Sequence, residues 1–153
     1  MLKNLLFFIS LILLAAMVLT LVFGQKKPHN LGVRDGRLAP CPDTPNCVSS
    51  LSKDPDHRVE PLTVRGDPHD PMAILKELTG SMARTLVVDE AEDYLWVRFS
   101  SRFFRFRDDL EFLYDREAGV IQVRSASRLG RYDFGVNRKR VERVREMFSR
   151  IEP

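Results

Sequence analysis

Basic and polar residues gather in the stretch 124–140, and their types suit the binding of an anion. Hydroxyl groups, glycine backbone and guanidinium groups just ahead of a helix supply hydrogen-bond donors, close approach and a favourable dipole. The sequence therefore predicts a site for a phosphate or carboxylate group that matters more to function than to folding. The predicted ligand-binding residues are Arg124, Ser125, Ser127, Arg128, Asp133, Asn137 and Arg138.

A structural role for the same stretch stays open. In that role Asp133 caps a turn, and the arginines pair with Glu142 and Glu146 on a solvated helix face. If the arginines instead brace carboxylates in a buried network, the loss of one arginine lowers stability rather than binding. The ligand site and the buried network therefore predict opposite results for Arg128→Ala.

Two adjacent carboxylates, Asp108 and Asp109, follow a run in which arginine alternates with phenylalanine. Consecutive residues of a strand point to opposite faces of the sheet, which weakens any mechanism that needs paired carboxylates. A salt bridge to Arg105 or Arg107 is the expected fate of one of them. A small hydrolase or transferase that uses Asp108 or Asp109 with the arginines of 124–140 is the alternative function.

Ser49 and Ser50 are secondary site candidates. Together with His57 they suggest a nucleophile and a base, but two serines beside a tight turn favour hydrogen bonds within the loop. The sequence contains no Gly-x-Ser-x-Gly, no phosphate-binding Walker loop and no histidine-rich metal motif. We expect neither a metal nor a cofactor, and no catalytic residue is assigned.

Cys41 and Cys47, the two cysteines of the chain, lie in a proline-rich turn. A metal site needs about four ligands at suitable spacing, which the three histidines do not provide. Five residues separate the cysteines, so they do not form the Cys-x-x-Cys motif of redox proteins. A disulfide in an oxidising compartment is the predicted state, with two unpaired thiols as the alternative.

Residues 5–23 carry no charge and are mostly apolar, unlike the rest of the 153-residue chain. A helix of this length spans about 30 Å, the thickness of the hydrocarbon core of a bilayer. We expect a membrane anchor; the alternative is a signal peptide cleaved near Gly24. The basic residues that follow favour a cytoplasmic domain, whereas the cysteines favour an outward-facing one. The predicted location is the bacterial inner membrane with the domain outside the cytoplasm, or a secreted or periplasmic protein after cleavage.

The spacing of apolar residues predicts the elements that position these groups. They are a short strand within 57–64, a helix from Pro71 that Asp70 caps and that stops at Gly80, strands over 85–88, 94–100, 110–114 and 120–125, and a long helix from Val136. The predicted fold class is α+β, an antiparallel sheet of four to five strands packed against two helices in the helix-grip manner. Residues 1–24 form the anchor or signal, 25–37 a linker and 38–153 a single domain.

Three sequence blocks are the most distinctive: Cys41–Ser50, Ser100–Phe112 and Arg124–Arg140. Together they resemble the family filed as domain of unknown function 1499, over about Leu38 to Ile151. The resemblance implies bacterial or plastid proteins that often carry a signal, lipoprotein or membrane segment, and it supports the disulfide and the envelope location. It implies no reaction. The chain departs from the lipoprotein members because it has no lipid-attachment cysteine.

Composition narrows the class of function. All acidic residues, and all basic ones but Lys3, follow residue 24, and this near balance of charge argues against nucleic acid as a partner. We predict a membrane-anchored envelope protein that binds an anionic small molecule, a lipid head group or a protein partner. The expected partners are the membrane, through residues 5–23, and an anionic ligand or envelope protein.

Overall fold

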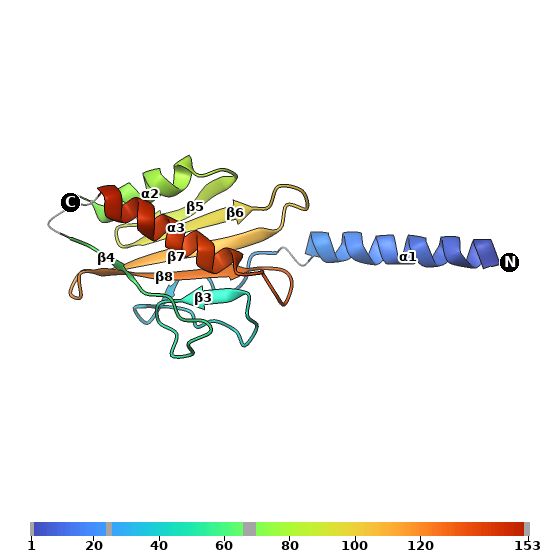
Figure 1. Ribbon diagram of the computed structural model, residues 1–153, viewed down its shortest axis with the longest axis horizontal. Coiled ribbons are helices and arrows are strands. Elements are labelled where there is room, and N and C mark those ends of the chain that lie inside the picture. The colour runs from blue at the N-terminus through green and yellow to red at the C-terminus, as the bar shows by residue number, and fades with distance from the viewer. Residues whose placement is uncertain (1, 24–25, 66–69, 152–153) are drawn as a thin grey trace.

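An antiparallel sheet with two helices on one face forms the body of the protein (Figure 1). The computed structural model describes residues 2–23, 26–65 and 70–151. The predicted α+β class is confirmed. A further helix, α1 (Leu2–Phe23), projects away from this body.

Four strands in consecutive hairpins make up most of the sheet. They are β5 (Thr85–Ala91), β6 (Tyr94–Ser100), β7 (Arg107–Asp115) and β8 (Val120–Ser127). Each strand pairs antiparallel with the next. β6 and β8 therefore run in the same direction, and their C-terminal residues lie at the same end of the sheet. These strands cover the four predicted ones. β5, β7 and β8 are longer than predicted because residues near the strand ends still pair with the neighbouring strands.

Two short strands complete a sheet of six strands, where the sequence predicts four to five. β3 (Cys47–Ser49) pairs with β8, and β4 (Leu62–Thr63) pairs with an earlier part of β8. β4 lies within the predicted strand segment 57–64. β3 escapes prediction because all three of its residues are buried, so no alternation of polar and apolar residues marks it.

Both helices pack on the same face of the sheet. α2 (Pro71–Ser81) begins as predicted, with the Asp70 carboxylate accepting the backbone N–H groups of Met72 and Ala73 at 2.9 and 3.0 Å. α3 (Val136–Ile151) buries an apolar stripe at helical spacing. The two stripes and the facing strand residues form one core; its largest fully buried side chains include Phe112, Phe148, Leu75, Leu95 and Leu110.

The other face of the sheet is partly covered by the N-terminal segment. β1 (Val33–Arg34) and β2 (Arg37–Leu38) form a small hairpin within and just after the stretch predicted as a linker. Leu38 is buried against Tyr94 and Trp96 in a second, smaller apolar cluster. This segment therefore takes part in the packing of the domain.

α1 exposes apolar side chains around its circumference. Leu5, Leu6, Phe7 and Phe8 occupy consecutive positions, which point to all sides of a helix, and each is more than half exposed. In the described part of the chain, no helix reaches the combined length and hydropathy of a membrane-crossing segment.

Candidate functional site

Several predicted ligand-binding residues lie in a buried polar network between the sheet and the start of α3. Asn137 is fully buried at its centre. Its side-chain oxygen accepts hydrogen bonds from Ser125 Oγ and Arg140 Nη1, both at 2.6 Å. Its side-chain nitrogen donates to Ser127 Oγ at 2.9 Å and to the backbone oxygen of Asn46 at 3.0 Å. The four hydrogen-bonding positions of this carboxamide are therefore all used within the protein.

Asp108 joins this network on the helix-covered face of the sheet. Its carboxylate accepts a hydrogen bond from Arg140 Nη2 at 2.6 Å, and both side chains are largely buried. The guanidinium of Arg140 also lies 4.5 Å above the ring of Phe99. Arg140 thereby joins α3 to the sheet by an ion pair and a cation–π contact.

Asp109 points to the opposite face, as strand alternation requires. Arg128 reaches both of its oxygens, through Nε at 2.7 Å and Nη2 at 2.8 Å. The Asp109 carboxylate also accepts the indole N–H of Trp96 at 2.9 Å. The side chains of Arg128 and Asp109 are only 3% and 1% exposed, so this is a buried, bidentate ion pair.

The partners of the two carboxylates differ from those that the sequence suggests. Arg105 and Arg107 are the expected partners because they are close in sequence, whereas the pairs found use Arg140 of α3 and Arg128 at the end of β8. The sheet brings β8 beside β7, and α3 lies across both. Residues that are distant in sequence therefore supply these guanidinium groups.

A second buried ion pair, which the sequence analysis missed, lies on the same face as Asp109. Glu111 accepts a hydrogen bond from Arg124 at 2.9 Å, and from the Tyr94 hydroxyl and the Gly32 amide at 2.8 Å each. Burial, and then the Glu111 carboxylate, raise the pKa of Tyr94 far above its ordinary value of 10.0. A glutamate between Leu110 and Phe112 in an apolar strand is the sequence signal for such a pair.

Asp133 and Arg138, at the start of α3, bind backbone groups. The Asp133 carboxylate accepts the amides of Gly135 at 3.0 Å and Asn137 at 2.8 Å, which is a helix cap. Arg138 donates to the backbone oxygens of Arg58 and Asp56 at 2.6 and 2.8 Å. The cap at Asp133 matches the structural role left open for the stretch 124–140. Arg138 differs from that role, because Glu142 and Glu146 pair with Arg145 and Arg150 instead.

The secondary candidates are both buried: Ser49 is the last residue of β3, and Ser50 follows it directly. Ser50 Oγ donates to Gln122 at 2.7 Å and accepts the amide of Val123 at 2.8 Å, while Ser49 Oγ accepts the amide of Leu51 at 3.2 Å. The Nδ1 atom of His57 lies 2.8 Å from the backbone oxygen of Cys47. The serine hydroxyls therefore hydrogen-bond to backbone amides and to Gln122, which is a structural arrangement rather than that of a nucleophile beside a base.

The predicted disulfide between Cys41 and Cys47 is confirmed. It joins Cys41 to the first residue of β3, Cys47, at a sequence separation of 6. Asn46, inside this loop, donates through Nδ2 to the backbone oxygen of Gly130 at 2.6 Å. The disulfide loop and the stretch 124–140 therefore converge in space.

Three arginines surround Asp109 on the face away from α2 and α3, and we call this group the arginine face: Arg98, Arg107 and Arg128. Arg98 lies directly opposite Asp109 in the strand register, and the Arg128 amide donates to the Arg107 backbone oxygen at 3.0 Å. Burial and then the charges of Arg107 and Arg128 lower the pKa of Arg98. Among the described residues, no hydrogen-bond partner reaches its buried Nε atom.

Of the arginine face, the sequence analysis proposed Arg128 alone as a ligand-binding residue. Arg98 is missed because it lies inside a strand whose pattern otherwise reads as core packing. The available signal is its position, since alternation puts Arg98 on the same face as Tyr94 and Trp96. A charged residue on a face that is otherwise aromatic needs a partner of opposite charge, and Asp109 lies opposite Arg98 in the register.

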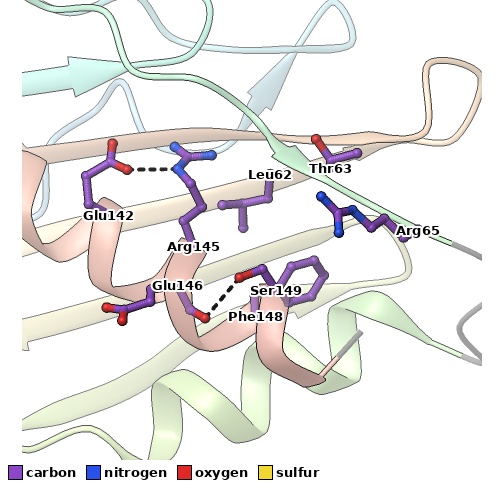
Figure 2. Close-up of a pocket in the computed structure, with 8 residues that line it drawn as sticks. All are labelled: Leu62, Thr63, Arg65, Glu142, Arg145, Glu146, Phe148 and Ser149. Carbon is purple, nitrogen blue, oxygen red and sulfur yellow. Dashed lines mark hydrogen bonds and ion pairs between the residues drawn. The ribbon is translucent and has the colours of Figure 1, made fainter. Parts of the chain in front are cut away.

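A pocket of about 300 Å³ lies between β4 and the second half of α3 (Figure 2). Arg145 forms one wall and donates to Glu142 at 2.9 Å and to the backbone oxygen of Pro61 at 2.6 Å. None of the site residues predicted from the sequence lines this pocket. In the described ranges, no three His, Cys, Asp or Glu side chains are placed to hold a metal ion.

Residues 37–148, well over half of the chain, match a family described as "Protein of unknown function (DUF1499)". The chain belongs to the DUF1499 family. The family predicted from the three sequence blocks is thereby confirmed. The DUF1499 match contains the disulfide and every candidate site residue, whereas α1 lies outside it. No curated protein and no solved structure matches this DUF1499 protein.

Proposed function

We propose that this DUF1499 protein is a membrane-tethered domain that binds an anionic group at the arginine face, without chemistry of its own. The observation that carries the proposal is the local charge balance, in which Arg98, Arg107 and Arg128 surround the carboxylate of Asp109. Like charges at close range repel, and this repulsion contributes to the lowered pKa of Arg98. A bound phosphate or carboxylate would reduce that repulsion and accept charge-assisted hydrogen bonds.

Arg98 is the residue best placed to contact such a ligand. Arg128 gives two of its donors to Asp109. Arg98 is half-buried, so part of its side chain is open to solvent, and no described group accepts a hydrogen bond from its buried Nε. Arg107, also half-buried, adds a second positive charge. A guanidinium fork suits the oxygens of phosphate or carboxylate groups, which accept two parallel hydrogen bonds.

The hydrolase or transferase alternative receives less support from the geometry. Its two carboxylates, Asp108 and Asp109, point to opposite faces of the sheet, and each already accepts hydrogen bonds from a guanidinium group. A general acid or base must lie beside the bound substrate. Neither carboxylate lines the pocket between β4 and α3.

The proposed tether is α1. Residues 5–23 carry no charged side chain, and the apolar side chains from Leu5 to Phe8 are exposed. The disulfide supports an oxidising compartment, and so a domain outside the cytoplasm; cleavage near Gly24 remains the alternative. The packing of the long α3 on the sheet supports the helix-grip description of the fold.

The test is a titration of the detergent-solubilised full chain with inorganic phosphate, in which calorimetry measures the binding. We expect saturable binding that weakens at least tenfold in Arg98→Met, because a hydrogen bond to a charged group contributes about 1.5–3 kcal/mol. The matched control is Arg116→Met, which removes an exposed arginine paired with Glu92 and Asp93 at the other end of β7. Absence of binding to wild type, or equal binding by Arg98→Met, contradicts the proposal.

A further inference from the structure

Two loops of the domain hold large aromatic side chains in solvent. Phe103 and Phe104, between β6 and β7, are 81% and 60% exposed, and Tyr132 and Phe134, between β8 and α3, are 64% and 90% exposed. Single exposed apolar residues are common on protein surfaces. Four aromatic side chains on two adjacent loops form a surface that needs an explanation. We call these residues the aromatic tips.

Both loops lie at one end of the sheet because β6 and β8 run in the same direction. The amide of Arg128 donates to the backbone oxygen of Arg107, which ties the bases of the two loops together. α1 projects from this end of the domain (Figure 1). Close to where α1 ends, Lys27 places its ammonium group 4.5 Å from the ring of Trp96, on the same sheet.

The loops hold defined conformations. Ser101 donates its amide to the Phe106 backbone oxygen at 2.9 Å and accepts the Phe106 amide at 3.0 Å, and the rings of Phe104 and Phe106 stack at 5.4 Å. Phe134 adopts a φ of 55°, a conformation that a bulky residue rarely takes, and is still directed into solvent. An exposed aromatic in a strained position indicates a role outside the folding of the domain.

The charges beside the aromatic tips are positive. Arg102, Arg105 and Arg131 are exposed, and the segment 101–106 contains no acidic residue. Asp133, the acidic residue of the other loop, is occupied by the amides that it caps. Aromatic rings flanked by arginine suit the boundary between anionic head groups and acyl chains, where the ring is partly buried and the guanidinium meets phosphate.

We propose that the aromatic tips dock into the surface of a bilayer rich in anionic phospholipid. This inference rests on the proposed tether, since α1 would keep the tips close to the bilayer. Its physical basis is separate: charge complementarity together with aromatic side chains that the fold holds outward. In this orientation the arginine face lies near the head-group layer, so a lipid phosphate is the anion nearest to it.

The test uses the full chain in vesicles, with tryptophan placed at the tips. Phe103→Trp and Phe134→Trp are compared with Glu117→Trp, an exposed position in the turn between β7 and β8 at the far end of the sheet. Vesicles contain brominated acyl chains, with either phosphatidylglycerol or phosphatidylcholine head groups. Trp96 is buried and provides the same background signal in all variants.

We expect bromine to quench the tryptophans at 103 and 134 at least twofold more than the tryptophan at 117, and to do so in phosphatidylglycerol vesicles. Arg102→Glu with Arg131→Glu should abolish this difference, because each arginine near an anionic surface changes affinity by about fivefold. Both arginines are exposed, so an unchanged thermal unfolding curve is expected.

Equal quenching at all three positions, with the protein still in the vesicle pellet, overturns the docking and leaves the tether intact. Absence of the protein from the pellet overturns both. If the tryptophans at the tips are quenched as strongly in phosphatidylcholine vesicles as in phosphatidylglycerol vesicles, the requirement for anionic lipid is contradicted. Self-association of the full chain that Phe134→Ser abolishes would assign the tips to a protein interface and also overturn the proposal.

Discussion

Arg128 illustrates how one residue type fits two roles until its neighbours are known. Seen in sequence beside serines and glycines, it predicts an anion site. In the structure its side chain is almost completely buried and paired with Asp109, which also accepts the indole N–H of Trp96. Its ligand role remains a prediction, and its contacts give it a structural role whether or not a ligand binds.

We expect Arg128→Ala to lower the free energy of unfolding by about 3–5 kcal/mol, because Asp109 would remain as a buried charge without its main partner. Urea denaturation of the full chain in detergent measures this change. The control, Arg131→Ala, removes an exposed arginine three residues away and should change stability by less than about 0.5 kcal/mol. A normal unfolding curve for Arg128→Ala would show that its ion pair contributes little to the fold.

Tyr94 gives the fold a dependence on alkaline pH. Its pKa is raised by burial and by Glu111, so the native state keeps the hydroxyl proton where the unfolded state releases it. The contribution of this hydroxyl group to stability is therefore fully present below pH 10.0 and is lost as the pH rises above that value. Denaturation at a series of pH values should show this slope in Tyr132→Phe, which removes an exposed tyrosine, and a smaller slope in Tyr94→Phe.

At the scale of elements, the helices and the four long strands follow from periodicity. The Asp70–Pro71 start of α2 and the apolar stripe of α3 are local signals, and so are the hairpin turns between strands. β3 has no such signal because its three residues are buried and its partner, β8, lies far along the chain. The same limit applies to the site, since the partners of Asp108 and Asp109 are set by the packing of β7 against β8 and α3.

The disulfide next to β3 provides a test of how this short strand is held. In the chain-entropy account, a loop of this length stabilises the fold by about 2–2.5 kcal/mol. We expect Cys41→Ser with Cys47→Ser to reduce the free energy of unfolding by about that amount, and to increase amide exchange most in β3 and in its partner residues of β8. An increase in amide exchange of the same size in all strands of the sheet would contradict a local role for the disulfide.

At the scale of the whole molecule, the account predicts that α1 keeps the chain at the membrane. Extraction of native membranes with alkaline carbonate should leave the protein in the pellet, with Lys3 still present at its N-terminus. A soluble product that begins at Gln25 would show cleavage of the segment instead.

Thiol alkylation of the same sample, without reductant, should leave both cysteines unlabelled. Two labelled cysteines would contradict the outward-facing domain.

The two ends of the sheet carry different side chains. One end carries the arginine face and the aromatic tips, and α1 projects from it, whereas the other end carries the turn at Arg116, which pairs with Glu92 and Asp93. With α1 as the proposed tether, the domain would present its basic end to an anionic surface. The central claim is therefore that the arginine face receives an anion.

The most direct test is the Nε–H signal of Arg98 in nuclear magnetic resonance spectra of the ¹⁵N-labelled full chain in detergent. Arg98→Lys assigns the signal by its loss, and the Nε–H of Arg116 serves as the internal control. Addition of inorganic phosphate should shift the Arg98 signal in a saturable manner and leave that of Arg116 unchanged. An Arg98 signal that stays in place, or that moves together with Arg116 in proportion to added salt, would contradict anion binding at the arginine face.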